Sequence, residues 1–99
     1  MIDELDFEII ELLQQRFLNG SSPWEVVKLF ESRVPRNHNG ALIASEYLQE
    51  AFQGSIFETK VIGAWDYFEG GTWSAEQIGD SLAEMCEDWK IRRRFIVEE

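Results

Sequence analysis

Residues 74–90 read SAEQIGDSLAEMCEDWK, the most regular helical pattern in the chain. Their apolar side chains recur every three or four positions, as on a helix that packs one face against a core: Ile78, Leu82, Met85, Cys86 and Trp89. Ser74, followed three residues later by Gln77, is typical of a capping box at a helix start. Lys90, Arg92, Arg93 and Arg94 lie near its expected end, where the helix dipole favours cations. We therefore predict a helix from about Ser74 through Arg94, with residues 95–97 either continuing it or packing as a short tail.

Two earlier segments show the same helical spacing. Residues 3–19 carry negative charge in the expected first turn, where the helix dipole favours it, and Gly20 suits a left-handed stop. The acids of that first turn are Asp3, Glu4 and Asp6. Residues 41–53 follow a polar loop over residues 36–40 and carry apolar side chains at helical intervals. Both segments are predicted helices.

A further helix is predicted to start at Ser22. Ser22 and Glu25 form a capping-box pattern, and Pro23 suits the first helical position. The apolar face of this helix would consist of Val26, Val27, Leu29 and Phe30. Its end is expected near Arg33, because Pro35 disfavours helical backbone at the residue before it.

Residues 55–69 have an ambiguous pattern. Ser55 and Glu58 repeat the capping box, and apolar side chains follow at intervals of three or four: Phe57, Val61, Ala64, Trp65 and Phe68. However, residues 59–68 also contain strand formers, and Gly63 weakens a helix by about 1 kcal/mol relative to alanine. We predict a helix in this segment, with a short strand over residues 59–68 as the alternative.

Together these segments predict an all-α fold, a compact bundle of four to five short helices in a single acidic domain over residues 1–99. A chain of 99 residues is long enough to bury one core. The single cysteine, Cys86, excludes an internal disulfide, which fits a reducing compartment. The acidic N-terminus and the lack of a long apolar run argue against a signal peptide or a membrane span. We therefore expect a cytoplasmic protein.

The chain is strongly acidic, with 19 acidic and 9 basic side chains and a formal net charge of −10. A field of this sign repels nucleic-acid phosphate and anionic membrane surfaces, so neither is expected as a direct partner. It favours a cationic partner, either a basic protein such as a toxin nuclease or a nucleic-acid-binding complex. The plain alternative is that the charge only keeps the protein soluble.

The usual catalytic and metal-binding patterns are missing from the sequence. His38 lies in the predicted polar loop, where a solvated side chain is favoured over a general base. Cys86 shares the apolar stripe, which favours a buried thiol over a nucleophile. One cysteine and one histidine cannot form a zinc site, and residues 66–77 lack ligands that a calcium loop needs. We expect no enzyme, cofactor or metal, with catalysis by carboxylates alone as the alternative.

The negative charge is concentrated between Lys60 and Lys90, where no basic residue occurs. Glu76, Asp80 and Glu84 follow one another at four-residue intervals, and each such like-charge pair costs a helix about 0.2–0.5 kcal/mol. A cationic partner would relieve this repulsion. The alternative is an exposed face whose charges have no role.

Aromatic residues occur in the same stretch. Trp65, Tyr67 and Phe68 cannot all face inward from one short helix, so we expect at least one ring at the surface, unless these rings close one end of the core. Exposed aromatic rings beside acids are typical of binding hot spots. The predicted partner-binding residues are Asp66, Tyr67, Glu69, Trp73, Glu76, Asp80, Glu84 and Glu87.

These features favour a small acidic inhibitor that blocks a basic or nucleic-acid-handling protein through a carboxylate-rich surface with an aromatic anchor. Bacterial immunity proteins and phage-encoded inhibitors share this size and charge, which is an analogy of physical profile and not of sequence. The alternative is an adaptor or a homodimeric assembly subunit that uses an apolar helix face, without catalysis.

Overall fold

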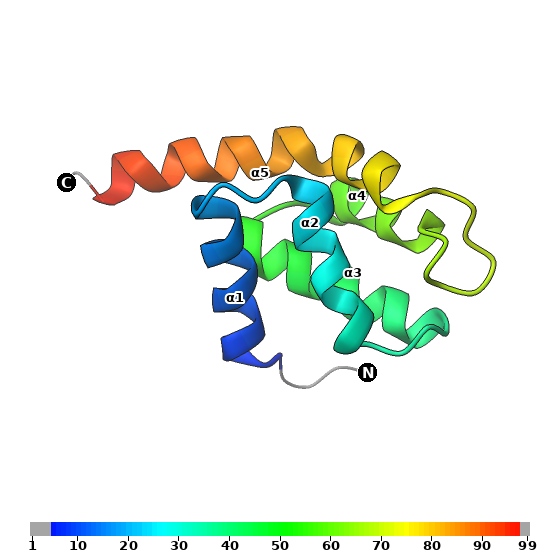
Figure 1. Cartoon of the computed structure of the whole chain (residues 1–99). Helices are drawn as coiled ribbons and strands as arrows, with labels where there is room; N and C mark the ends of the chain where they lie inside the picture. Colours follow the sequence, from blue (N-terminus) through cyan, green and yellow to red (C-terminus); the bar gives the residue numbers. More distant parts are fainter. Residues whose placement is uncertain (1–4, 98–99) are drawn as a thin grey trace.

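The computed structural model describes residues 5–97, with side chains described through Arg93, and it confirms the all-α prediction (Figure 1). Two short 3₁₀ helices, η1 (Leu29–Ser32) and η2 (Lys60–Ala64), directly continue two of the α-helices. The α-helices are α1 (Phe7–Leu18), α2 (Pro23–Lys28), α3 (His38–Phe52), α4 (Ile56–Thr59) and α5 (Ala75–Val97). The Cα radius of gyration is 12.8 Å, the value of a compact domain of this length.

Capping side chains start three of the helices where the sequence predicts them. At each start the backbone N–H of a serine donates to the side-chain oxygen of the residue three positions on. The pairs are Ser22–Glu25 at 2.8 Å, Ser55–Glu58 at 2.9 Å and Ser74–Gln77 at 2.9 Å. These local contacts fix where α2, α4 and α5 begin.

The start of the first helix was predicted wrongly. The helix α1 begins at Phe7, and Asp6 lies just before it, where its carboxylate accepts the backbone N–H of Glu8 at 2.9 Å. Asp6 is therefore the N-cap and not a residue of the first turn, since a capping side chain needs extended backbone outside the helix. Asp3 and Glu4 lie outside the described residues.

The predicted loop over residues 36–40 is shorter than expected, because α3 begins at His38 and not at Ala41. The side chain of Asn37 accepts the backbone N–H of Gly40 at 3.0 Å and caps the helix. The polar composition indicated a loop, whereas asparagine at this position starts a helix. His38 is exposed in the first turn of α3.

The ambiguous segment is helical through Ala64, and the alternative of a strand over residues 59–68 is wrong. Within residues 5–97 the only β-type pairing is an isolated bridge between Trp65 and Trp73. The chain leaves the helix at Trp65, whose backbone is extended. Residues 65–74 then form a surface loop that leads into α5.

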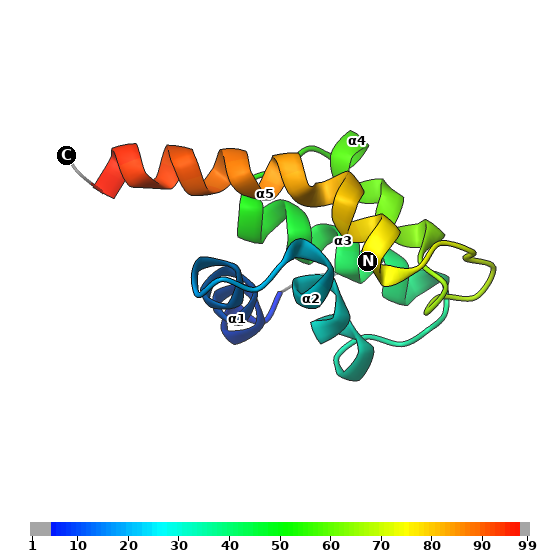
Figure 2. The same cartoon turned by 45° about the horizontal axis from the view of Figure 1, so that its top comes forward.

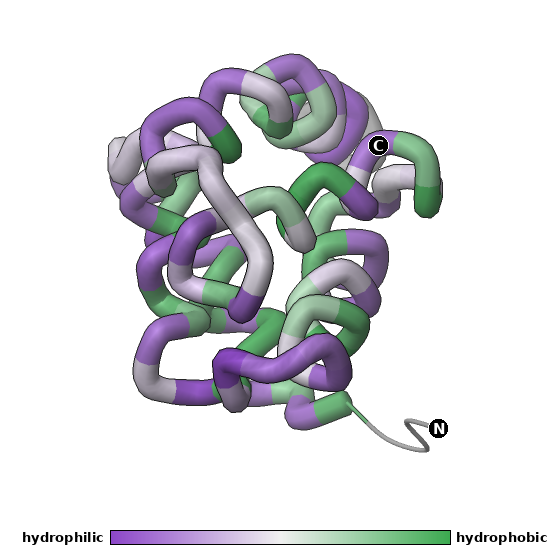
Figure 3. Tube along the Cα trace, turned by 90° about the vertical axis from the view of Figure 1, so that its right-hand side faces the viewer, coloured by the Kyte–Doolittle hydropathy of each residue, from purple (hydrophilic) through white to green (hydrophobic). Residues whose placement is uncertain are grey.

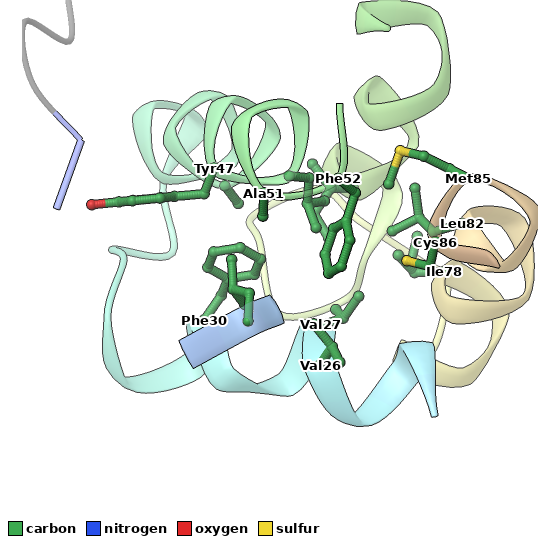
Figure 4. Close-up of a cluster of buried hydrophobic side chains, with 14 of the residues drawn as sticks. Val26, Val27, Phe30, Tyr47, Ala51, Phe52, Ile78, Leu82, Met85 and Cys86 are labelled. Atoms are coloured by element: carbon green, nitrogen blue, oxygen red, sulfur yellow. The ribbon is translucent and has the colours of Figure 1, made fainter. Parts of the chain in front are cut away.

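The core lies between α5 and the helices beneath it. Figure 4 shows Val26 and Val27 from α2 and Phe52 from α3 converging with the apolar stripe of α5, all of it buried as predicted. Phe52 lies edge-to-face on Trp89, with ring centroids 5.0 Å apart. Figure 3 shows hydrophilic positions along the outer turns of the bundle. None of the helices described is both long and apolar enough to cross a membrane.

A glycine allows α5 to lie directly on α2. A Cβ atom added to Gly79 would stand 2.5 Å from the backbone nitrogen of Trp24, closer than real side chains pack. The two helices therefore touch backbone to backbone at this crossing. The contact sets the position of α5, the longest helix of the structure, which lies along one side of the bundle (Figure 2).

The C-terminal end of α5 extends past the body of the molecule (Figure 1). Trp89 is the last side chain that the structure describes as buried, and Ile91, Arg92 and Arg93 after it are exposed. The helix nevertheless continues to Val97, so of the two predicted arrangements for residues 95–97 the continuous helix is correct.

Candidate protein-binding surface

The outer side of α5 carries a row of exposed carboxylates. At 3.6 residues per turn the four acids of this row lie within an arc of about 80° and extend over roughly 16 Å. The row consists of Glu76, Asp80, Glu84 and Glu87, all exposed. Burial of Ile78 and Leu82 on the other side of the helix keeps this row turned to solvent.

The hydrogen bonds that the structure describes do not pair this acidic row with the protein's own cations. Three arginines donate to backbone carbonyls: Arg33 to Leu29, Arg36 to Tyr67 and Arg92 to Asp88. The carboxylates that accept hydrogen bonds do so at helix starts: Asp6, Glu25 and Glu58. The carboxylates of the row therefore face solvent with their charge uncompensated by these contacts.

The loop over residues 65–74 places further acids and one indole beside the start of α5. The loop closes on itself, because the N–H of Asp66 donates to the carbonyl of Trp73 at 2.7 Å and the N–H of Trp73 donates to the carbonyl of Ala64 at 2.8 Å. Asp66 and Glu69 are exposed on it. Trp73 is 38% exposed and lies two residues before α5, three residues before Glu76 at the start of the acidic row.

Tyr67 has a structural role that sequence reasoning missed. Its hydroxyl donates toward the carbonyl oxygens of Val34, at 2.6 Å, and Glu31, at 2.9 Å. The Nε of Arg36 donates back to the carbonyl oxygen of Tyr67 at 2.7 Å. The half-buried Tyr67 therefore ties the 65–74 loop to the segment before α3, and it is less exposed than Trp73.

The prediction that at least one of the three neighbouring aromatic rings lies at the surface assumed that all three belong to one helix. In the structure that helix ends before them. Trp65 and Phe68 are both buried, and Tyr67 packs against them with ring centroids 4.9 and 5.1 Å away. A turn can direct three nearby side chains inward, whereas one stripe of a helix cannot. The alternative, that these rings close one end of the core, is correct for Trp65 and Phe68.

Two apolar features were also missed by the sequence reasoning. Ile91 is 52% exposed, and it lies four residues after Glu87 on the same side of α5 as the acids. Extending the helical pattern past Trp89 would have found it. The second feature is a trough between α3 and α4, which includes the exposed side chains Leu42 and Ile56. No pattern within one segment could have found the trough, because two helices form it.

The residues considered as candidates for catalysis do not lie together in a reactive centre. Burial raises the pKa of the Cys86 thiol to about 12, so the reactive thiolate is scarce at neutral pH. His38 stands exposed on α3, and Cys86 is buried on the inner face of α5. Among the described residues, no group of three or more His, Cys, Asp or Glu is arranged to hold a metal ion.

Comparison of the chain with protein-family models, with curated proteins and with solved structures finds no match. Function must therefore be inferred from the chain's own residues.

Proposed function

We propose that this protein is a small acidic inhibitor that binds a basic or nucleic-acid-handling protein through the acidic row of α5. The observation that carries the proposal is the row itself, four exposed carboxylates on one side of α5, with the 38% exposed Trp73 three residues before the first of them. Asp66 and Glu69 extend the negative surface onto the neighbouring loop.

In this mechanism the carboxylates occupy positions on the target where lysine and arginine normally hold phosphate. Carboxylates can accept the same charge-assisted hydrogen bonds as phosphate oxygens. Trp73 supplies apolar area at one end of the row, as aromatic anchors do in interface hot spots. The net charge of −10 accelerates the encounter with a cationic target more than it sets the final affinity.

The spacing of the row supports a role in binding. Glu76, Asp80 and Glu84 form two like-charge pairs, each of which costs roughly 0.2–0.5 kcal/mol in an isolated helix. A lysine at Asp80 would remove both repulsions without touching the core, because this position is exposed. A cationic target that contacts the row relieves the same repulsion.

The test is affinity capture at low salt with two forms of the full-length protein. In the first form the row is neutralised by Glu76→Gln, Asp80→Asn and Glu84→Gln. The matched control removes the same charge elsewhere, by Glu8→Gln, Glu11→Gln and Glu31→Gln, all at exposed positions. We expect a cationic protein to remain bound to the unaltered protein and to the control, and to elute from the neutralised form at much lower salt.

The captured protein then allows a kinetic measurement. Its association rate constant should fall steeply as ionic strength rises, because screening weakens electrostatic steering. An association rate that ignores ionic strength, or equal retention by the neutralised form and the control, would rule out the acidic row as the binding surface.

A further inference from the structure

The trough between α3 and α4 is a second surface, separate from the acidic row. Its central part has a volume of about 570 Å³ and exposes apolar side chains of both helices: Leu42, Ile43 and Ile56. Leu42 is 48% and Ile56 is 50% exposed, and both line this one hollow, so they form a shared apolar surface and not two isolated exposed side chains. Along α3 the trough extends from His38 to Gln49, roughly 17 Å at the rise of an α-helix.

The rim of this α3–α4 trough is mainly acidic. Glu46 lies on its central part, Glu50 at one end and Glu69 at the other. One lysine, Lys60, also lines it, and its ammonium lies 5.6 Å from the ring centroid of the exposed Phe57. An apolar floor with an acidic rim suits an amphipathic helix that carries aliphatic and basic side chains.

The chain contains a segment of that chemistry at the end of α5. Residues 90–97 read KIRRRFIV, four basic residues with Ile91 among them, followed by three bulky apolar residues. This segment is helical, and Ile91 is 52% exposed beside the exposed Arg92 and Arg93. Its eight residues span about 12 Å, which fits within the length of the trough.

The segment cannot reach the trough of its own molecule. Residues 75–97 form one continuous helix, and Figures 1 and 2 both place its C-terminal end at one end of the molecule, with α4 and η2 toward the other. We propose that residues 90–97 of one copy bind in the α3–α4 trough of a second copy. The exposed apolar trough and the projecting basic helix then cover each other. Glu76, Asp80 and Glu84 of the acidic row stay outside this contact, and Glu87 lies one turn before it. The inference does not rest on the proposed function.

The first test is the mass of the full-length protein by sedimentation, measured over a wide concentration range at physiological ionic strength. Screening over about 8 Å weakens the mutual repulsion of the two acidic molecules but not the charges in direct contact. We expect the mass to rise above that of the monomer with concentration. A strict monomer at the highest attainable concentration would overturn the proposal.

Charge reversal identifies the contacting surfaces. One variant carries Arg92→Glu and Arg93→Glu in the helix end, and another carries Glu46→Lys and Glu50→Lys on the trough. Each alone should raise the dissociation constant about tenfold or more, the effect of losing one strong interface contact. Mixing the two variants should restore association, because the acidic helix end then meets a basic trough and the unaltered helix end meets an unaltered trough.

The matched control is Glu8→Lys with Glu11→Lys, which makes the same charge change on α1. Its mixture with the helix-end variant keeps only one of the two favourable contacts, so it should associate more weakly than the mixture of the helix-end and trough variants. Circular dichroism checks that each variant is folded. If a charge variant does not fold, Leu42→Ser and Ile91→Ser remove the apolar contact at exposed positions and should each weaken association. Failure of the mixed variants to associate, or unchanged association of both serine variants, would contradict the proposal.

Discussion

Cys86 illustrates how burial alone determines the chemistry of one side chain. Its sulfur lies in the apolar stripe of α5, and the side chain is 2% exposed. Loss of water around the thiolate raises the thiol pKa to about 12, with a smaller contribution from the charge of Glu87. A thiol in this state is part of the core and not a nucleophile.

This environment predicts a loss of stability at alkaline pH. Because the pKa of Cys86 is raised in the folded protein, the folded state holds the proton more tightly than the unfolded state. The contribution of the thiol proton to the free energy of unfolding is complete at pH values below the thiol pKa of the unfolded state. It is lost as pH rises from about 9 toward 12, by at most about 4 kcal/mol. Urea unfolding between pH 8 and 11 should show a smaller loss for Cys86→Ala than for the unaltered protein. Equal losses would show that folding does not raise the thiol pKa.

At the scale of elements, the crossing of α2 and α5 depends on one missing side chain. Gly79→Ala would place a methyl group 2.5 Å from the backbone nitrogen of Trp24 and force the helices apart. We expect a loss of roughly 1–3 kcal/mol in the free energy of unfolding, the usual cost of overpacking, although alanine is the better helix former. Denaturant unfolding followed by circular dichroism measures this loss.

The matched control is Gly63→Ala in η2. An added Cβ there meets no heavy atom within 4 Å, and the residue is exposed. The free energy of unfolding should stay within about 0.5 kcal/mol of the original, as for most surface substitutions. If both alanine variants behaved alike, the close contact at Gly79 would not govern how α5 packs.

The sequence predicts those elements whose determinants lie within one segment. Capping boxes at Ser22, Ser55 and Ser74 placed three helix starts, because the donor and acceptor are three residues apart. The 65–74 loop could not be predicted in this way. Tyr67 is fixed by carbonyl groups of Val34 and Glu31, more than thirty residues away in the chain.

The candidate site also has one part that the sequence predicts and other parts that it does not. The acidic row of α5 follows from the spacing of Glu76, Asp80 and Glu84 within one helix, and the structure leaves these side chains exposed. The α3–α4 trough depends on the distance between two helices, which local patterns do not encode. The hydrogen bonds of Tyr67 could not be predicted from the sequence, because their partners come from other parts of the chain.

At the scale of the whole molecule, the net charge of −10 opposes folding through self-repulsion. Asp80→Lys brings the net charge two units closer to zero and converts two repulsive pairs on α5 into attractive ones. We expect it to raise the free energy of unfolding by about 0.5–1 kcal/mol at low salt, with a smaller gain at high salt. The same variant should bind the proposed cationic target more weakly. Thermal or urea unfolding at two salt concentrations measures the stability change.

Glu11→Lys on α1 is the control, since it makes the same change in net charge at an exposed position outside the acidic row. It should stabilise the protein less than Asp80→Lys and leave binding of the target unchanged. Equal gains from both substitutions would show that total charge matters and that the arrangement of the row does not.

The contact between α2 and α5 also affects the order in which the protein can fold during synthesis. Val26 and Val27 lie early in the chain, but they are covered by Ile78 and Leu82, about fifty residues later (Figure 4). A growing chain that has not yet reached residue 89 exposes this apolar surface on the ribosome, where chaperones can bind it. The nascent protein therefore completes its core only after its last long helix has emerged.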